Sequence, residues 1–226
     1  MKQRGDARSL WDLWVEIQLG DLKLTLADVL AELPLTIIGT DGPQVDGRSE
    51  EDSTVADFRW LLERLRDGAG LRLNCGGEVI TAPDGRVWGR DRFFLSGEML
   101  WGEDTGVAVS TTTGPEPLYQ RLRGFLARED ESLWGYRIPL PTGSYRVRLH
   151  LAETQFNTKG FRRYDVWAQE RQVLHDVDAL EEAGFRTALV KEFSVELAGG
   201  PLEIRFVYRS GQRPPSVAGI EIEIRD

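Results

Sequence analysis

The chain has 226 residues and a formal net charge of −9, and hydrophobic residues make up 41% of it. This length suits one large domain, or a standard domain joined to a small one. The acidic balance argues against nucleic acid as a partner. No apolar run approaches the roughly 20 residues that a membrane span needs, so we also expect no membrane partner.

The chain has a single cysteine, Cys75, which excludes an intrachain disulfide and is compatible with a reducing compartment. Residues 1–8 are not followed by an apolar segment of the kind that a signal peptide contains. We therefore expect a cytoplasmic protein, unless the sequence is a fragment of a larger one.

Residues 1–70 differ from the rest and carry a net charge of −6, with 8 Lys and Arg against 14 Asp and Glu. Alternating patterns at residues 14–19 and 22–26 predict two short strands, and residues 26–33 predict a short helix. Apolar residues then recur at helical spacing over residues 55–65. We expect a small acidic region of mixed helix and strand, of unknown role.

The helix over residues 55–65 has recognisable end signals. Ser53 or Thr54 precedes its first apolar residue and can cap its N-terminus. The glycines in residues 68–70 can end it and form a linker. We therefore place a domain boundary between residues 70 and 71.

From residue 71 onward the hydrophobic period is two. Tyr145, Val147 and Leu149 alternate with Arg146 and Arg148. The same alternation continues over residues 192–197, 202–208 and 220–225. It predicts half-buried antiparallel strands separated by turns, which is typical of a two-sheet β-sandwich. We expect the last strand, residues 217–224, to be an inner strand.

Seven motifs of residues 71–226 resemble, in their order, the malectin-type carbohydrate-binding domains. The motifs are LRLNCGG (71–77), DGRVWGRD (84–91), PLYQRLR (117–123), YRIPLPTGSYRV (136–147), LAETQF (151–156), YDV (164–166) and VAGIEI (217–222). The resemblance implies a mainly β protein, a jelly-roll-like antiparallel β-sandwich. It also implies that ligands bind in loops at one end of the sandwich.

The resemblance implies a site in which a sugar ring lies on aromatic side chains and its hydroxyl groups meet polar side chains. Carried over position by position, the expected ligand-binding residues are Phe156, Gln155, Asn157, Phe125, Trp101 and Arg213. The alternative is that the aromatic residues pack in the core or in loops and that Arg213 is a solvated loop charge.

Three positions depart from the family pattern. Gly124 stands where the family has an aromatic residue, and Gln155 replaces one of two adjacent aromatics. Arg213 aligns with an acidic residue, which is a charge reversal. A different sugar, or a protein, is therefore favoured over the di-glucosylated glycan of the animal family member.

The sequence offers no catalytic constellation. It has two histidines, and it lacks a nucleophile elbow, a phosphate-binding glycine loop and zinc-ligand spacing. We expect Cys75 to be a buried, inert thiol, and Glu153 to anchor a loop through backbone amides or through Arg162 or Arg163. We expect Tyr119 to be a core residue and Arg123 a structural one. The chain is interpreted as a non-enzyme that needs no cofactor and no metal.

Two functions remain open. One is a non-catalytic carbohydrate-binding module. The alternative is a protein-interaction or sensor module on a malectin scaffold, within a cytoplasmic bacterial signalling or defence assembly. A narrow aromatic groove with polar rims near Phe156 favours sugar, and a broad flat apolar patch favours a protein. A third hypothesis gives residues 1–70 no role beyond completing the core, through Trp11, Trp14, Ile17 and Trp60.

Overall fold

A computed structural model describes residues 50–66, 68, 70–101, 114–127 and 130–225, without the side chains of residues 50–55, 66 and 101. The strands and the helix expected within residues 14–33 lie outside the described residues. The chain divides into two compact units, Met1–Asp67 and Gly68–Asp226, and each is described by itself.

The described part of the first unit is helix α3, Glu50–Arg66. It begins earlier than predicted, so Ser53 and Thr54 lie inside it and the proposed cap at either residue is wrong. Acidic residues at positions 50–52 explain the earlier start, because negative side chains stabilise the first turn of a helix. The helix ends before Gly68, as expected. No helix in the described ranges is long and apolar enough to cross a membrane.

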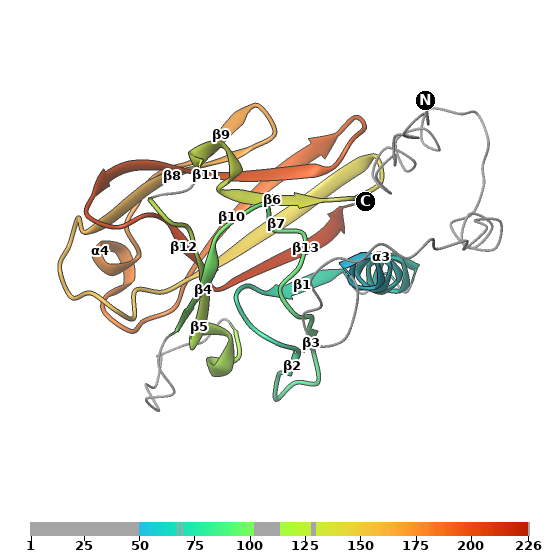
Figure 1. The fold of residues 1–226 in the computed structure, drawn as a ribbon, viewed down its shortest axis with the longest axis horizontal. Helices are drawn as coiled ribbons and strands as arrows, with labels where there is room; N and C mark the ends of the chain where they lie inside the picture. The colour runs from blue at the N-terminus through green and yellow to red at the C-terminus, as the bar shows by residue number, and fades with distance from the viewer. Residues whose placement is uncertain (1–49, 67, 69, 102–113, 128–129, 226) are drawn as a thin grey trace, which may run out of the picture. The chain divides into compact units, whose positions relative to one another are not determined.

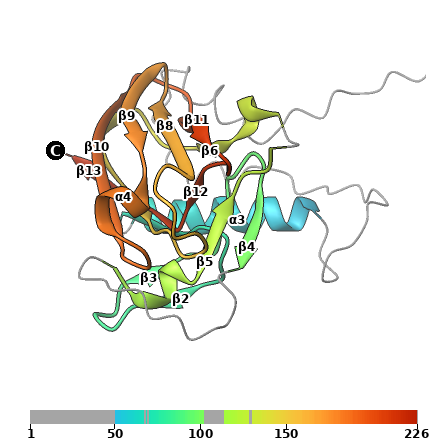
Figure 2. The ribbon, with the colours of Figure 1, turned by 90° about the vertical axis from the view of Figure 1, so that its left-hand side faces the viewer.

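The second unit is built on two four-stranded sheets (Figures 1 and 2). The first has the order β1 (Leu71–Asn74), β13 (Gly219–Arg225), β7 (Gly143–Leu151), β10 (Leu189–Leu197). The second has the order β6 (Gly135–Ile138), β11 (Leu202–Gly211), β8 (Arg162–Ala168), β9 (Arg171–Val177). All neighbouring strands are antiparallel, and β13 pairs on both sides, which confirms that the last strand is an inner one.

Alternating side chains of both sheets form the core between them. On β7, Tyr145, Val147 and Leu149 are buried, and on β11 Ile204 and Phe206 are buried. Burying one face of each strand removes large apolar side chains from water and favours stacking of the two sheets. The predicted jelly-roll-like β-sandwich is confirmed.

Smaller elements complete the second unit. They are a sheet with the order β12 (Ser216–Val217), β5 (Arg121–Gly124), β4 (Glu98–Trp101), a hairpin of β2 (Ile80–Thr81) and β3 (Val87–Trp88), two 3-10 helices η1 (Glu116–Tyr119) and η2 (Glu131–Leu133), and helix α4 (Ala179–Ala183). Figure 2 shows β12, β5 and β4 below β8 and β11. β12 and β13 are separated by one residue, so the inner strand of the sandwich also holds the small sheet in place.

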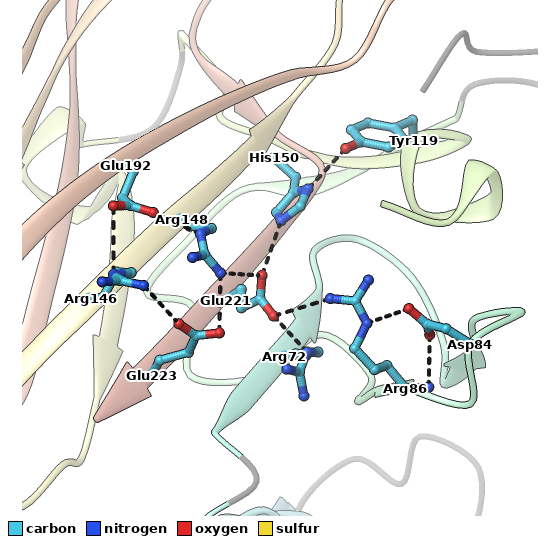
Figure 3. A network of polar contacts seen from close by, with 10 residues as sticks. All are labelled: Arg72, Asp84, Arg86, Tyr119, Arg146, Arg148, His150, Glu192, Glu221 and Glu223. Carbon is cyan, nitrogen blue, oxygen red and sulfur yellow. Dashed lines mark hydrogen bonds and ion pairs between the residues drawn. The ribbon is translucent and has the colours of Figure 1, made fainter. Parts of the chain in front are cut away.

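The other face of the first sheet carries a polar network, shown in Figure 3. Glu221 lies at its centre, and its carboxylate accepts a hydrogen bond from Arg72 Nε at 2.7 Å. Arg148 bridges Glu221 and Glu223 at 3.4 and 3.1 Å. His150 Nδ1 lies 2.9 Å from the Tyr119 hydroxyl. The network ties β1, β7 and β13 together through paired charges, and the contact between Tyr119 and His150 adds η1.

Motif residues in the first half of the sandwich stabilise the fold through buried polar contacts. Arg123 pairs with Asp91 at 2.6 Å, and both side chains are buried. The same carboxylate accepts hydrogen bonds from Gly76 N at 2.6 Å and from the Tyr136 hydroxyl at 3.0 Å. Tyr119 is fully buried. The predictions that Tyr119 is a core residue and Arg123 a structural one are confirmed.

Candidate functional site

A concave pocket of about 340 Å³ lies where β4 meets three loops, and we call it the Phe156 pocket. The loops are the segment that follows β5, the loop between β7 and β8, and the loop between β11 and β12. Its lining includes Glu98, Leu100, Phe125, Gln155, Phe156 and Arg213. Segments that are far apart in the sequence are thus brought to one place by the ends of the strands.

Glu153 fixes the loop that carries Phe156. One carboxylate oxygen accepts hydrogen bonds from the backbone N–H groups of Gln155 and Phe156, at 2.9 and 3.1 Å. The other accepts a hydrogen bond from Arg162 Nε at 2.9 Å. The Glu153 and Arg162 side chains are only 5% and 8% exposed. The prediction that Glu153 anchors a loop through backbone amides and an arginine is confirmed.

Arg162 connects two walls of the Phe156 pocket. Its Nη1 donates to the carbonyl oxygen of Pro214 at 2.5 Å, and its Nη2 donates to Gln155 Oε1 at 3.1 Å. Sequence reasoning named Arg162 only as a partner for Glu153 and missed its place in the pocket. The signal was available, because Arg162 shares the inward face of β8 with Tyr164 and Val166. A charged side chain at an inward position needs a buried partner.

Gly211 brings the loop before β12 against the loop after β7. Its φ is 108°, and a Cβ there would lie 2.7 Å from the Gly160 carbonyl oxygen and overlap that of Phe161. The backbone N–H groups of Gln212 and Arg213 both donate to the Phe161 carbonyl, at 2.8 and 3.1 Å. Only glycine tolerates this approach, so the position of Arg213 depends on Gly211.

The Arg213 side chain lies over two aromatic rings. Its Cζ is 5.2 Å from the ring centroid of Phe156 and 6.0 Å from that of Phe161. These two rings pack against each other with centroids 4.7 Å apart. A guanidinium at this distance from a ring is attracted to its π face. The two ring contacts orient the Arg213 guanidinium without using its N–H donors.

Phe125 lies deeper than Phe156. It is 2% exposed, and its ring packs against Phe206 and Trp134 with centroid distances of 5.2 and 6.2 Å. It therefore packs as a core aromatic and forms the floor of the pocket. Phe156 is half-buried and is the more accessible of the two rings.

Leu100 explains the glycine at position 124. A side chain at Gly124 would overlap the side chain of Leu100 on the paired strand β4. Leu100 itself lines the Phe156 pocket. The aliphatic Leu100 thus occupies the space beside position 124, where the family resemblance leads one to expect an aromatic ring.

Four of the six predicted residues line the pocket, namely Phe125, Gln155, Phe156 and Arg213. Asn157 is exposed and does not line it. Trp101 belongs to β4, but its side chain lies outside the described part of the chain. Sequence reasoning missed Glu98, Leu100 and Gln212 because residues 98–101 show no clear strand pattern and Gln212 lies in the irregular loop between β11 and β12.

Cys75 is fully buried, and burial raises the pKa of its thiol well above the ordinary value. The prediction of a buried, inert thiol is confirmed, because a thiol that stays protonated is a poor nucleophile. Over the described ranges, no group of three or more His, Cys, Asp or Glu side chains could hold a metal ion.

Two curated plant proteins resemble the chain in sequence. Both are probable leucine-rich repeat receptor-like serine/threonine-protein kinases of Arabidopsis thaliana, 28% and 27% identical over 167 residues. The alignments cover 60% and 61% of this chain, but 16% and 17% of the kinases. The chain therefore spans about a sixth of the length of these relatives.

Solved structures share the fold. A β-glucuronidase of Bacteroides uniformis matches with a TM-score of 0.59 and 20% identity, over 71% of this chain and 18% of that one. The ANX2 ectodomain of Arabidopsis thaliana matches with a TM-score of 0.56 and 19% identity, over 69% of this chain and 50% of that one.

The family model described as the malectin domain matches residues 69–214, which is more than half of the chain. The match covers every strand of the two four-stranded sheets except β13, and it includes Phe156 and Arg213. The chain belongs to the malectin domain family.

Proposed function

We propose that the chain is a non-catalytic carbohydrate-binding module and that its ligand occupies the Phe156 pocket. The observation that carries this proposal is the composition of the pocket, in which an accessible ring lies among the polar side chains of Gln155, Arg162, Gln212 and Arg213. A sugar ring presents apolar C–H faces to an aromatic ring and hydroxyl groups to polar side chains. The volume of about 340 Å³ suits a small ligand, since such sites span roughly 300–1,000 Å³.

Family membership supports a recognition role. The matched relatives are receptor-like kinases in which the region similar to this chain is a minor part. A segment of that size within a kinase fits a module that binds a ligand for the larger protein. One structural neighbour is a β-glucuronidase, an enzyme named for a carbohydrate substrate. The carbohydrate specificity of this chain is our proposal.

The surface around the pocket favours sugar over a protein partner. Among the described residues, the exposed large apolar side chains lie on the β2–β3 hairpin, at residues 94 and 133, on β11 and on β13. None of them lines the Phe156 pocket. A protein-binding surface would present a broad contiguous apolar patch there. A concave pocket with one accessible ring and a polar rim is the arrangement expected for a sugar.

A glycan array tests the proposal, with the purified chain and a Phe156→Ala variant. We expect the wild-type chain to bind a defined set of neutral or acidic glycans, and Phe156→Ala to reduce that binding at least tenfold. Phe185→Ala is the matched control, because Phe185 is also a half-buried loop aromatic but lies outside the pocket. Circular dichroism of each variant checks that it is folded.

Two results would count against a carbohydrate module. The first is a folded wild-type chain that binds no glycan. The second is a glycan whose binding is equally strong in Phe156→Ala, because that ligand would occupy another surface. A pull-down with the full chain would then address the protein-interaction alternative.

A further inference from the structure

We propose that Arg213 makes the Phe156 pocket selective for glycans that carry a carboxylate, such as a uronic acid residue. This inference rests on the proposed carbohydrate-binding function and names the class of ligand for the same site.

Arg213 is held in place by contacts that, among the described residues, leave the hydrogen-bond donors of its guanidinium available. Its backbone N–H is bonded to the Phe161 carbonyl, and its guanidinium lies over the Phe156 and Phe161 rings. Stacking on a ring uses the face of the guanidinium, whereas its five N–H donors lie in the plane of the group. No carboxylate among the described residues lies within ion-pair distance of Arg213, and no described acceptor takes a hydrogen bond from its guanidinium.

The second arginine of the pocket shows what a structural guanidinium looks like in this chain. Arg162 is 8% exposed, is neutralised by Glu153, and donates to Pro214 and Gln155. Its donors are used within the protein. Arg213 lines the same pocket and is exposed. The two arginines therefore have different roles: Arg162 builds the pocket and Arg213 presents a positive charge to whatever enters it.

The chemistry of the group that fits Arg213 follows from the shape of the guanidinium. Its planar fork matches the two oxygens of a carboxylate, and such a pair is stronger than a hydrogen bond between neutral groups. In a uronic acid the C6 carbon, which is attached to the ring, is this carboxylate. The sugar ring keeps the apolar face that lies on Phe156. One ring can therefore contact Phe156 and Arg213 together, since the two side chains touch.

Glu98 sets the orientation of the ligand. It lines the same pocket from β4, and it would repel a carboxylate placed next to it. It can accept hydrogen bonds from sugar hydroxyl groups. The acidic substituent is thus directed toward Arg213, and the hydroxyl groups toward Glu98.

The test compares matched ligands by isothermal titration calorimetry on the full chain. The probes are a glucose disaccharide, the disaccharide with one C6 hydroxymethyl group oxidised to a carboxylate, and the disaccharide sulfated at that position. We expect the wild-type chain to bind the carboxylate form at least tenfold more tightly than the neutral one. Raising the salt concentration should weaken only the charged ligands, because exposed charges are screened.

Variants assign the selectivity to Arg213. Arg213→Gln should bind the neutral and carboxylate forms equally, and Arg213→Glu should prefer the neutral form. Arg213→Lys should keep part of the preference, because it keeps the charge but loses the planar fork. Arg209→Gln is the matched control and should leave the preference unchanged, since Arg209 lies on β11, outside the pocket, and pairs with Asp176 at 3.2 Å.

The outcomes distinguish the proposed role of Arg213 from the proposed carbohydrate-binding function. If the wild-type chain binds neutral and acidic forms equally and Phe156→Ala abolishes both, the carbohydrate function holds and the role of Arg213 is overturned. If the sulfated form binds more tightly than the carboxylate form, the assignment of a carboxylate is overturned. If no glycan of any kind binds, both proposals fail together.

Discussion

Glu221 is a buried carboxylate whose charge stabilises the fold. Burial raises the pKa of Glu221, but the His150 ring and the Arg72 guanidinium lower it by more. The resulting pKa is about 2, compared with an ordinary value of 4.5. Because the folded-state pKa lies below the unfolded-state value, ionised Glu221 stabilises the protein above about pH 4.5, and that stability is lost as the pH falls toward 2. We expect Glu221→Gln to lower the free energy of unfolding at pH 7, measured by urea denaturation. The difference from wild type should shrink between pH 4.5 and pH 2.

Glu192 provides the control for Glu221. It also pairs with Arg148, at 2.8 Å, but its side chain is 49% exposed. Exposed ion pairs contribute up to about 1 kcal/mol, so Glu192→Gln should change the free energy of unfolding by less than that. If Glu221→Gln and Glu192→Gln lower the free energy of unfolding equally at pH 7, Glu221 stabilises the fold no more than an exposed carboxylate does.

Glu153 combines a structural and a functional effect in one side chain. Glu153→Gln keeps an oxygen for the backbone N–H groups of Gln155 and Phe156, but it leaves the Arg162 charge without its partner. Removing one member of a buried ion pair typically costs about 3 kcal/mol or more, and we expect a loss of that size in thermal or chemical unfolding. Glycan affinity should fall as well, because the loop bearing Phe156 loses its anchor. A variant with wild-type stability and wild-type affinity would contradict the role given to Glu153.

At the scale of elements, the side chain of Leu100 on β4 packs beside Gly124 on β5, which pairs directly with Glu98. A Cβ at position 124 would overlap Leu100, so Gly124→Ala should lower the free energy of unfolding by about 1–3 kcal/mol through overpacking. The double variant Gly124→Ala, Leu100→Ala should recover part of that loss, because the second change removes the overlapping atoms. Urea denaturation of the two single variants and the double variant gives the coupling between the positions. Strictly additive losses would show that the two residues do not interact.

The strands were predictable where apolar and polar residues alternate over many positions, and they were harder to predict where this alternation is absent. Residues 143–151, 192–197 and 219–225 alternate cleanly, and each is a strand within the sandwich. β4 was missed because its four residues, Glu98–Trp101, do not alternate between apolar and polar side chains. The N-terminus of α3 was misplaced because the acidic residues at positions 50–52 extend the helix beyond the apolar pattern.

The site followed the same division. Phe156 and Gln155 were predictable because they belong to a recognisable motif at the end of a strong strand, and Arg213 because it aligns with an acidic position of the family. The depth of Phe125 was not predictable from sequence, since it depends on Phe206 and Trp134 from other strands. Nor was the Arg162 bridge to the Pro214 carbonyl, because it joins positions 52 residues apart. Such contacts depend on how the strands are ordered, and a local pattern does not encode that order.

At the scale of the whole molecule, the division into two units poses a question about stability. Unit Gly68–Asp226 has its own core between two sheets and a further buried cluster around Trp88, and Trp88 and Trp134 are each 1% exposed. A domain with a complete core can fold alone. We expect a protein of residues 68–226 to unfold in one cooperative transition and to keep the near-UV circular dichroism of its buried tryptophans. Its glycan affinity should match that of the full chain within about threefold, since the Phe156 pocket belongs to this unit.

The matching experiment distinguishes this independent unit from the third hypothesis, in which residues 1–70 complete the core. If residues 68–226 lack a cooperative transition, or bind a hydrophobic dye that the full chain does not bind, the second unit needs the first for its core. A domain that folds but binds glycans much more weakly than the full chain would instead give the acidic first unit a part in recognition. The independent-unit prediction therefore requires both the cooperative transition and the retained affinity.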